Sequence, residues 1–440
     1  MKFIKTEQDF NKLFSNRLFD KIVKESTIRS KRNINRQEFN DIKKSLYNEL
    51  STYSYQPSAI EENVFIYKLN NVARIIPILS VKDELLYYFV CKMIEKEIAF
   101  NRVEFTYGGW RLGNEIKLEE DSEIEYVYKS YNPSLWFEHW KSFTNIVYQE
   151  SEKMTPNDIA LKLDIANFYD TINLSILEKK LLVETGKDKI EYINMLMHFL
   201  HNWNLKTDKY HPKTVGLPQN EFGDQSRLLS NLYLQGYDAH IKRYCDSVGA
   251  KYFRYADDQI IICDRASVNN ILYLVCYELN LLGLNLNASK VQELDRDKIR
   301  VFYGTEIFAL FDTERYDEAV DLFYEYKNSG SIFKDDSILK RMISIGLNPF
   351  NLSNQNKIKS LILDYNFIKK QDDKFFNKIY KLLTDDEKNC FIQELLKISD
   401  ETVYNGFHYN FLNFLEKYKR TFEKEAGQVK QRIESIAMIK

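Results

Sequence analysis

Two adjacent aspartates, Asp257 and Asp258, are the residues of this sequence best suited to chemistry. Apolar and aromatic side chains flank them, with Tyr252 and Phe253 before and three isoleucines at 260–262 after. This pattern predicts two strands joined by a tight acidic turn, which would hold the carboxylates at the tip of a rigid hairpin. Adjacent aspartates are often only a solvated turn, so the pair alone is weak evidence for a site.

A third carboxylate, Asp164, ends a segment (161–165) that alternates with period two and therefore predicts a strand. Carboxylates delivered from two strands are what a two-metal site needs, with Mg²⁺ ions ~3.5–4 Å apart for an in-line displacement at phosphorus. Magnesium takes a few carboxylates and completes its octahedron with phosphate and water oxygens. We therefore expect Asp164 and Asp257 to bridge two Mg²⁺ ions, with Asp258 in support.

Helices and strands that could position these aspartates follow from the hydrophobic periodicity. Residues 11–50 predict helices that carry ten Lys and Arg side chains against five acids. Strands are predicted at 63–82, ending near Pro77, and at 251–263 around the acidic pair. Helices are predicted at 83–100, 175–200 and 226–244, and helical periodicity dominates from about 313 to 440.

The composition of the 440 residues restricts the class of protein. Hydrophobic residues make up 44% and charged residues 29%, which predicts a soluble globular chain and excludes wholesale disorder. Only 14 Gly and 7 Pro favour long helices over a turn-dense β-sandwich. The formal charge of −2 does not exclude a nucleic-acid partner, because the basic N-terminal region is offset by an acidic stretch at 115–125.

No targeting or membrane segment is predicted. Residues 1–14 lack the apolar core of a signal peptide, and no run approaches the ~18 apolar residues of a membrane helix. The five cysteines form no CxxC pair, which favours reduced thiols. We therefore expect a cytoplasmic protein.

Several segments together resemble the motif series of reverse transcriptases, in family order. The matching segments are 163–170 (LDIANFYD), 216–219 (GLPQ), 255–258 (YADD) and 283–287 (GLNLN) with Lys290. Upstream, Lys68, Arg74, Pro77 and Asp83 resemble the fingers motifs, and 303–305 (YGT) stands where the family has its primer-grip hairpin. The resemblance covers roughly residues 60–310, and four ordered motifs make it far more specific than YADD alone.

The resemblance implies roles for individual residues. The implied catalytic residues are Asp164, Asp257 and Asp258, which with Ile165 form the implied metal set for two Mg²⁺ ions, or Mn²⁺ in their place. Tyr169 matches the steric gate that rejects a 2′-hydroxyl, and so implies deoxynucleotide substrates. The other implied nucleotide contacts are Lys68 and Arg74 at the triphosphate, Gln219 near the nascent base pair and Lys290 at the departing pyrophosphate. The implied primer or template contacts are Tyr255, Gly216, Pro218, Tyr303 and Gly304.

The implied fold is α+β, a right-hand polymerase whose palm has an antiparallel sheet carrying the YADD hairpin. The expected parts are a helical N-terminal extension (1–60), fingers (61–155), palm (156–312) and an α-helical thumb and C-terminal region (313–440). The last region is aromatic and ends with a moderate basic surplus. An ordinary structural thumb and an added RNA- or partner-docking module both fit it.

Departures from the group II intron enzymes indicate a narrower group. Asn220 replaces a glycine, and the Ser-Pro step that usually follows is absent. The following helix begins with Ser226-Arg227, which is similar to abortive-infection and defence-associated bacterial reverse transcriptases. The segment Tyr107–Arg111 has one residue more than the corresponding Tyr-Gly-Phe-Arg of the intron enzymes. In addition, no His/Cys-rich endonuclease segment follows the palm.

The resemblance therefore implies an RNA-directed DNA polymerase that acts on a dedicated non-coding RNA in antiphage defence. Its expected partners are the RNA template, the DNA product and deoxynucleotides, and a homo-oligomer or partner protein stays open. A protein-primed, template-independent DNA polymerase is one alternative, in which none of the 30 tyrosines can be singled out as primer. A maturase-like RNA-binding scaffold is the other, although a scaffold has no reason to crowd three carboxylates together.

Overall fold

The computed structural model describes residues 6–24, 26–68, 72–100, 102–110, 112, 136–204, 216–219 and 223–437. The chain divides into two compact units. The first unit comprises 1–25, 34–62 and 77–299, and the second comprises 26–33, 63–76 and 300–440. The acidic stretch 115–125 and Asn220 lie outside the described residues.

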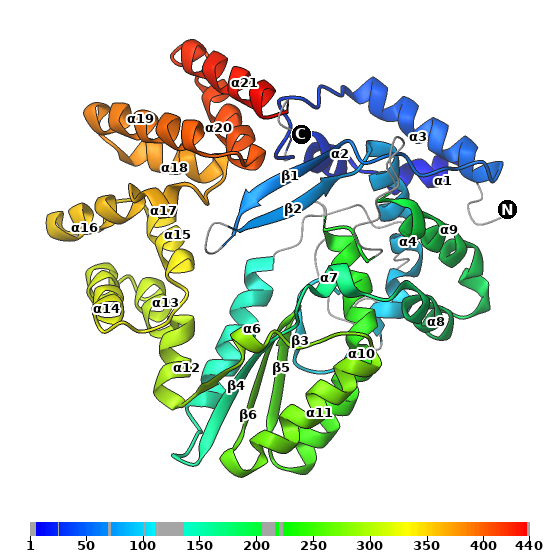
Figure 1. Cartoon of the computed structure of the whole chain (residues 1–440), viewed down its shortest axis with the longest axis horizontal. Helices are drawn as coiled ribbons and strands as arrows, with labels where there is room; N and C mark the ends of the chain where they lie inside the picture. The colour runs from blue at the N-terminus through cyan, green and yellow to red at the C-terminus, as the bar shows by residue number, and fades with distance from the viewer. Residues whose placement is uncertain are drawn as a thin grey trace. The chain divides into compact units, whose positions relative to one another are not determined.

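The first unit contains a five-stranded sheet, four strands of which, β3 to β6, are labelled in Figure 1. Its strands, in spatial order, are β3 (Thr106–Tyr107), β5 (Lys251–Tyr255), β6 (Asp258–Asp264), β4 (Asp158–Asp164) and β7 (Gln292–Leu294). All neighbours are antiparallel except β3 and β5, which are parallel. The strands predicted at 161–165 and 251–263 are therefore present, and they lie side by side.

Two long helices supply much of the core of the first unit. Both α4 (Val81–Phe100) and α10 (Asp224–Ser247) are buried along most of their length, and they contact each other. Burial on nearly all sides explains why residues 83–100 read as an apolar helix. The other helices of this unit are α1 (Glu7–Lys12), α2 (Asn16–Lys24), α3 (Arg36–Ser51), α6 (Trp136–Ser151), α7 (Phe168–Thr171), α8 (Leu174–Thr185), α9 (Ile190–Asn202) and α11 (Val268–Leu281).

The single helix expected at 175–200 is two helices, α8 and α9. They separate at Gly186, whose φ of 73° lies in the left-handed region that glycine tolerates and a continuing helix cannot use. A short 3-10 turn at Lys187–Lys189 then leads into α9. Helical periodicity on both sides of Gly186 hid this break.

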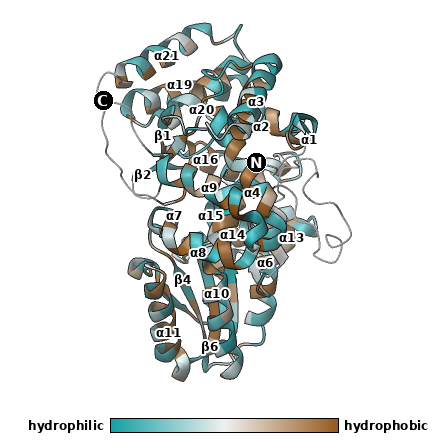
Figure 2. Cartoon of the chain, turned by 90° about the vertical axis from the view of Figure 1, so that its right-hand side faces the viewer, coloured by the Kyte–Doolittle hydropathy of each residue, from teal (hydrophilic) through white to brown (hydrophobic). Residues whose placement is uncertain are grey.

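The second unit combines a β-hairpin with helices. The hairpin consists of β1 (Glu62–Tyr67) and β2 (Ala73–Ile78). The helices, which confirm the helical pattern expected beyond 313, are α13 (Thr305–Asp312), α14 (Tyr316–Asn328), α15 (Asp335–Ile345), α16 (Leu352–Ile362), α17 (Tyr365–Ile368), α18 (Asp373–Leu382), α19 (Asp385–Glu401), α20 (Asn405–Lys417) and α21 (Glu423–Ala437). Brown and teal lie on different sides of many helices, as expected of amphipathic packing (Figure 2).

The hairpin is tied to α20 within this unit. The backbone N–H of Phe65 donates to Asn405 Oδ1 at 2.7 Å, and Asn405 Nδ2 donates to the carbonyl of Asn63 at 3.0 Å. The hydroxyl of Tyr67 donates to Thr402 Oγ1 at 2.7 Å. One asparagine side chain therefore binds two backbone groups of β1.

The prediction of a primer-grip hairpin at 303–305 is wrong. Residues Arg296–Tyr303 form α12 and Thr305 begins α13, with Gly304 between them at a φ of 60°. A left-handed glycine ends one helix and redirects the chain into the next, so a YGT sequence suits a helix break as well as a hairpin.

None of the described helices has the length and apolar character that a membrane span requires.

Candidate active site

The acidic turn lies at the tip of the hairpin formed by β5 and β6, as the sequence predicts. Tyr255 pairs with Asp258 across the hairpin, which leaves only Ala256 and Asp257 in the turn. Ala256 has a φ of 52°, a left-handed conformation that costs a non-glycine residue free energy. This geometry aims the Asp257 side chain from a short and strained turn.

Asp164 lies directly opposite this hairpin. It ends β4 and is the register partner of Asp258 on β6. The next residue, Ile165, forms an isolated bridge with Leu286 of the GLNLN segment. Antiparallel pairing thus brings the C-terminal end of β4 next to the N-terminal end of β6. Three of the motif segments therefore meet at this end of the strands, namely 163–170, 255–258 and 283–287.

The carboxylate of Asp164 is bound by a lysine. Lys290 Nζ lies 3.0 Å from both carboxylate oxygens of this aspartate, and Asn287 Nδ2 donates to Oδ2 at 3.3 Å. The backbone N–H of Asn287 also donates to the Asp164 carbonyl at 2.8 Å. The structure therefore places Lys290 at the site, on a carboxylate predicted to be a metal ligand.

Electrostatic crowding at the site is visible in Asp257. Burial, followed by the nearby Asp258 and Asp164 carboxylates, raises the pKa of Asp257 to about 6, against the opposing effect of Lys290. A carboxylate with a raised pKa beside two others is short of positive charge, and oxygen-only donors suit Mg²⁺. The donor set therefore fits a divalent cation chemically.

The described ranges nevertheless hold no group of three or more His, Cys, Asp and Glu side chains that could hold a metal ion in its present arrangement. The Lys290 ammonium compensates the charge of one of the three carboxylates, Asp164. The predicted metal ligands therefore lie at adjacent strand ends without surrounding a common point. They are Asp164, Ile165, Asp257 and Asp258.

Tyr169 and the GLPQ loop are in direct backbone contact. The N–H of Leu217 donates to the Tyr169 carbonyl at 2.9 Å. A Cβ on Gly216 would lie 2.1 Å from that same carbonyl oxygen, so only glycine fits. The backbone of Pro218 is held by α10, because the Pro218 carbonyl accepts a hydrogen bond of 2.6 Å from the Ser226 hydroxyl. Gln219 is half-buried at the end of this loop.

The Tyr255 ring belongs to an aromatic cluster beside the hairpin. Its centroid lies 5.0 Å from that of Trp140 and 5.8 Å from that of Phe143. A Cβ on Gly108 would lie 3.1 Å from the Tyr255 ring, so the 107–110 turn passes close to the β5–β6 hairpin. Packing fixes the ring, and its predicted primer contact stays a prediction.

The remaining predicted residues belong to the second unit. Lys68 and Arg74 are exposed near the end of the β1–β2 hairpin, where the Lys68 N–H donates to the Val72 carbonyl at 2.8 Å. Tyr303 is buried at the end of α12, with Lys334 Nζ 5.4 Å from its ring centroid. A Cβ on Gly304 would lie 2.6 Å from Ile338 Cδ1. Tyr303 and Gly304 thus have packing roles in this unit.

Asn287 and Arg227 lie at the site without having been predicted there. Asn287 had no signal in the sequence beyond its place in the GLNLN segment. Arg227, noted only as a departure from other enzymes, pairs with Asp224 at 2.8 Å. A Cβ on Gly109 would lie 2.4 Å from Arg227 Cβ, so the second glycine of the 107–110 turn admits this side chain.

Comparison with known proteins is consistent with the sequence motifs. Residues 116–307 match the family model described as reverse transcriptase (RNA-dependent DNA polymerase). The solved structures similar to this chain include apo telomerase from Candida tropicalis truncated from its C-terminal domain. That similarity has 16% sequence identity and a TM-score of 0.33, and it covers 57% of this chain and 55% of the telomerase chain. No curated protein matches the sequence.

Proposed function

We propose that this chain, whose residues 116–307 carry a reverse transcriptase domain, polymerises deoxynucleotides on an RNA template with the help of Mg²⁺. The expected enzyme class, RNA-directed DNA polymerase, is confirmed by that domain. The observation that carries the mechanism is the Asp257–Asp258 turn opposite Asp164, with the pKa of Asp257 raised to about 6.

Each residue of the site has a task in this proposal. Asp164, Asp257 and Asp258 would hold two Mg²⁺ ions, or Mn²⁺ in their place, with the Ile165 carbonyl at the edge of the set. When bound, the ions would activate the primer 3′-hydroxyl and neutralise charge on the phosphates. Lys290 would then leave Asp164 and turn its ammonium towards the pyrophosphate as a proton donor.

Other residues would select and orient the substrates. The Tyr169 ring would lie under the sugar and exclude a 2′-hydroxyl. Gln219 would lie near the new base pair, and Lys68 and Arg74 would neutralise the triphosphate. Tyr255, Gly216 and Pro218 would line the path of primer and template. The parts of the proposed polymerase are fingers at 61–155, palm at 156–312 and a helical thumb and C-terminal region at 313–440.

The biological setting we propose is antiphage defence in a bacterial cytoplasm, on a dedicated non-coding RNA. Support comes from Ser226-Arg227 in the first turn of α10, which resembles the defence-associated enzymes. The net charge of −2 is compatible with RNA binding, since affinity depends on local charge and falls with salt.

The decisive experiment measures deoxynucleotide incorporation on a primed RNA template by the variant Asp257→Ala with Asp258→Ala. We expect loss of synthesis by at least ~10³-fold, since the variant lacks two of three metal-binding carboxylates. The matched control is Asp385→Ala with Asp386→Ala, another adjacent aspartate pair that is exposed at the start of α19, and it should retain activity. Undiminished synthesis by the first variant would refute the mechanism.

The same reaction separates the alternatives. Sequencing the nucleic acid that copurifies with the chain identifies template and product together. Product that stays attached to protein after denaturation, and forms without template, would show protein-primed synthesis in place of reverse transcription. RNA binding without any incorporation would show a scaffold.

A further inference from the structure

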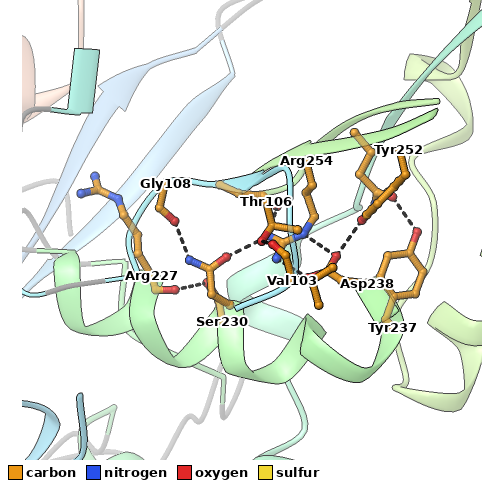
Figure 3. A network of polar contacts seen from close by, with 12 residues as sticks. Val103, Thr106, Gly108, Arg227, Ser230, Tyr237, Asp238, Tyr252 and Arg254 are labelled. Carbon is orange, nitrogen blue, oxygen red and sulfur yellow. Dashed lines mark hydrogen bonds and ion pairs between the residues drawn. The ribbon is translucent and has the colours of Figure 1, made fainter. Parts of the chain in front are cut away.

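A fully buried ion pair lies behind the catalytic turn. Arg254 on β5 and Asp238 on α10 both have side chains with 0% exposure, and the guanidinium binds the carboxylate through two of its nitrogens. Arg254 Nε donates to Asp238 Oδ1 at 2.7 Å, and Nη2 donates to Oδ2 at 2.5 Å. Tyr252 also donates to Asp238 Oδ1, at 2.7 Å (Figure 3).

Such a pair is weak evidence for stability, because removing both charges from water is costly. A hydrophobic pair of similar volume is often as stable. The remaining guanidinium nitrogen gives a more specific reason for Arg254. Its Nη1 donates to the carbonyl of Ala256 at 2.9 Å and to Asn231 Oδ1 at 2.9 Å.

Ala256 is the residue that needs support. It has the left-handed φ of 52° and immediately precedes Asp257 in the turn. Left-handed backbone is unfavourable for alanine and persists only where the surroundings fix it. The hydrogen bond from Arg254 fixes the carbonyl on one side, and the Ala256 N–H donates to the Tyr107 carbonyl at 3.4 Å on the other.

Asn231 extends this support to the 107–110 turn. Its amide Nδ2 donates to the Gly108 carbonyl, while its Oδ1 accepts from Arg254. In Figure 3 the side chains between Gly108 and Asp238 form one continuous set of contacts along α10. The turn at 107–110 is therefore linked through the Asn231 amide to the guanidinium that holds the Ala256–Asp257 turn.

We propose that Arg254 is a positioning residue, which holds Ala256 in its left-handed conformation and thereby aims Asp257 at the metal. Asp238 fixes the guanidinium, and Asn231 couples its position to Gly108. The metal-binding role of Asp257 rests on the proposed function. The positioning of Asp257 by Arg254 is a separate statement that metal binding tests without catalysis.

The test measures the Kd for Mn²⁺ by electron paramagnetic resonance, together with kcat and KM for a deoxynucleotide. Arg254→Lys keeps the charge opposite Asp238 but cannot reach Asp238 and Ala256 together, because lysine lacks the planar fork. We expect the Mn²⁺ Kd to rise roughly tenfold and kcat to fall, with KM for the nucleotide unchanged.

Rescue distinguishes positioning from general stability. Ala256→Gly removes the backbone strain, so adding it to Arg254→Lys should restore most of the Mn²⁺ affinity. The control Tyr237→Phe removes a buried hydrogen bond to Gln259 that does not involve Arg254, and it should lower the Tm with no change in the Mn²⁺ Kd.

Three outcomes would overturn the positioning role: normal Mn²⁺ affinity in Arg254→Lys, no rescue by glycine, or weakened Mn²⁺ binding in Tyr237→Phe. If Arg254→Lys does not fold, Ala256→Val serves as the second variant, because it strains the same turn and leaves the ion pair intact. We expect Ala256→Val to weaken Mn²⁺ binding. Normal Mn²⁺ binding by Ala256→Val would also overturn the positioning role. Lack of polymerisation by the wild-type chain would refute the proposed function and leave the Mn²⁺ comparison valid.

Discussion

At the scale of single residues, Gly216 shows how a loop is held against a helix. A Cβ at this position would lie 2.1 Å from the Tyr169 carbonyl oxygen and 2.8 Å from the Asp170 carbonyl carbon. Both obstacles are backbone atoms, which cannot rotate away as a side chain can. The close approach of the GLPQ loop to α7 therefore depends on the absence of a side chain.

We expect Gly216→Ala to lower the free energy of unfolding by about 1–3 kcal/mol, as overpacked sites do. Urea unfolding of the full chain measures this change. The control Gly236→Ala lies inside α10, where a Cβ would only contact Lys180 Nζ at 3.5 Å. That control should be neutral or stabilising by up to about 1 kcal/mol, so equal destabilisation of both variants would contradict the explanation.

Tyr169 offers a test of substrate selection. Its backbone is fixed by the contact with Leu217, and its half-buried ring is the one proposed to exclude a 2′-hydroxyl. We expect Tyr169→Ala to reduce the preference for deoxynucleotides over ribonucleotides by about 10–200-fold, the discrimination that one shape contact supplies.

The ratio of kcat/KM for dNTP and rNTP measures that preference. Tyr169→Phe keeps the aromatic face and should keep the discrimination. Unchanged sugar selectivity in Tyr169→Ala would show that another residue excludes the 2′-hydroxyl.

Residue types and local spacing were enough to predict the three aspartates and the hairpin that holds two of them. The support behind that hairpin was not predictable, because Asp238 and Asn231 lie on α10, and their contact with Arg254 depends on how that helix packs against the sheet. The contact of Lys290 with Asp164 was not predicted either. The motifs indicated a metal ligand at Asp164 and a pyrophosphate contact at Lys290, and neither role implies a salt bridge between the two side chains.

At the scale of elements, the β1–β2 hairpin depends on α20. Gly406 at the start of α20 has no room for a side chain, since a Cβ would lie 2.5 Å from Ile66 Cγ2 and 2.7 Å from the Phe65 carbonyl oxygen. The neighbouring Asn405 supplies the two hydrogen bonds to β1. The hairpin with Lys68 and Arg74 is therefore held by a helix more than 300 residues away in sequence.

We expect Gly406→Ala to destabilise the chain by about 1–3 kcal/mol and to raise KM for the deoxynucleotide, because it displaces the hairpin proposed to contact the triphosphate. Urea unfolding and steady-state kinetics check both effects. Gly427→Ala in α21 is the matched control, since nothing lies within 4 Å of its Cβ. An unchanged KM in Gly406→Ala would separate the hairpin from nucleotide binding.

The packing of α20 also predicts a pH effect through His408. Its fully buried ring lies with Nδ1 3.0 Å from the Tyr404 carbonyl oxygen and Nε2 2.9 Å from that of Ser399. Burial lowers the pKa of His408, with an opposing effect of the two carbonyls, while the charges of Arg432 and Asp400 act in opposite directions.

The unfolded state therefore binds a proton that the folded state excludes, and the stability from His408 is lost as pH falls below about 6.5. We expect His408→Gln to flatten the rise in unfolding free energy between pH 5 and 7.5. Urea titrations at several pH values measure that slope, and identical slopes for both chains would contradict a neutral, buried imidazole.

Helices and strands were predictable where one face is buried and the other exposed, as in the alternation that gives β4. The breaks at Gly186 and Gly304 were not, because each glycine is surrounded by residues of good helical periodicity. Whether a glycine continues a helix, ends it or forms a turn depends on tertiary space, such as the Ile338 side chain beside Gly304. Pattern alone therefore predicted the kind of element better than its ends.

At the scale of the whole molecule, the second unit is assembled from three separate stretches of chain. Besides the hairpin it includes residues 26–33, where Arg29 and Lys417 both pair with Asp373, and Asn413 Nδ2 donates to the Thr27 carbonyl at 2.8 Å. Neither the N-terminal segment nor the hairpin has these partners in a chain that ends at residue 299. Residues 26–33 and the hairpin therefore depend on the C-terminal helices for these contacts.

We expect the fragment 1–299 to expose residues 26–33 and 63–76, because their hydrogen-bond and ion-pair partners are removed. Limited proteolysis should cut these two stretches much faster in the fragment than in the full chain, with the β5–β6 hairpin as an internal reference that stays protected. Adding a separate 300–440 fragment should restore protection by supplying α18 and α20. Equal protection of 26–33 and 63–76 in the fragment and in the full chain would mean that these stretches fold without the C-terminal helices.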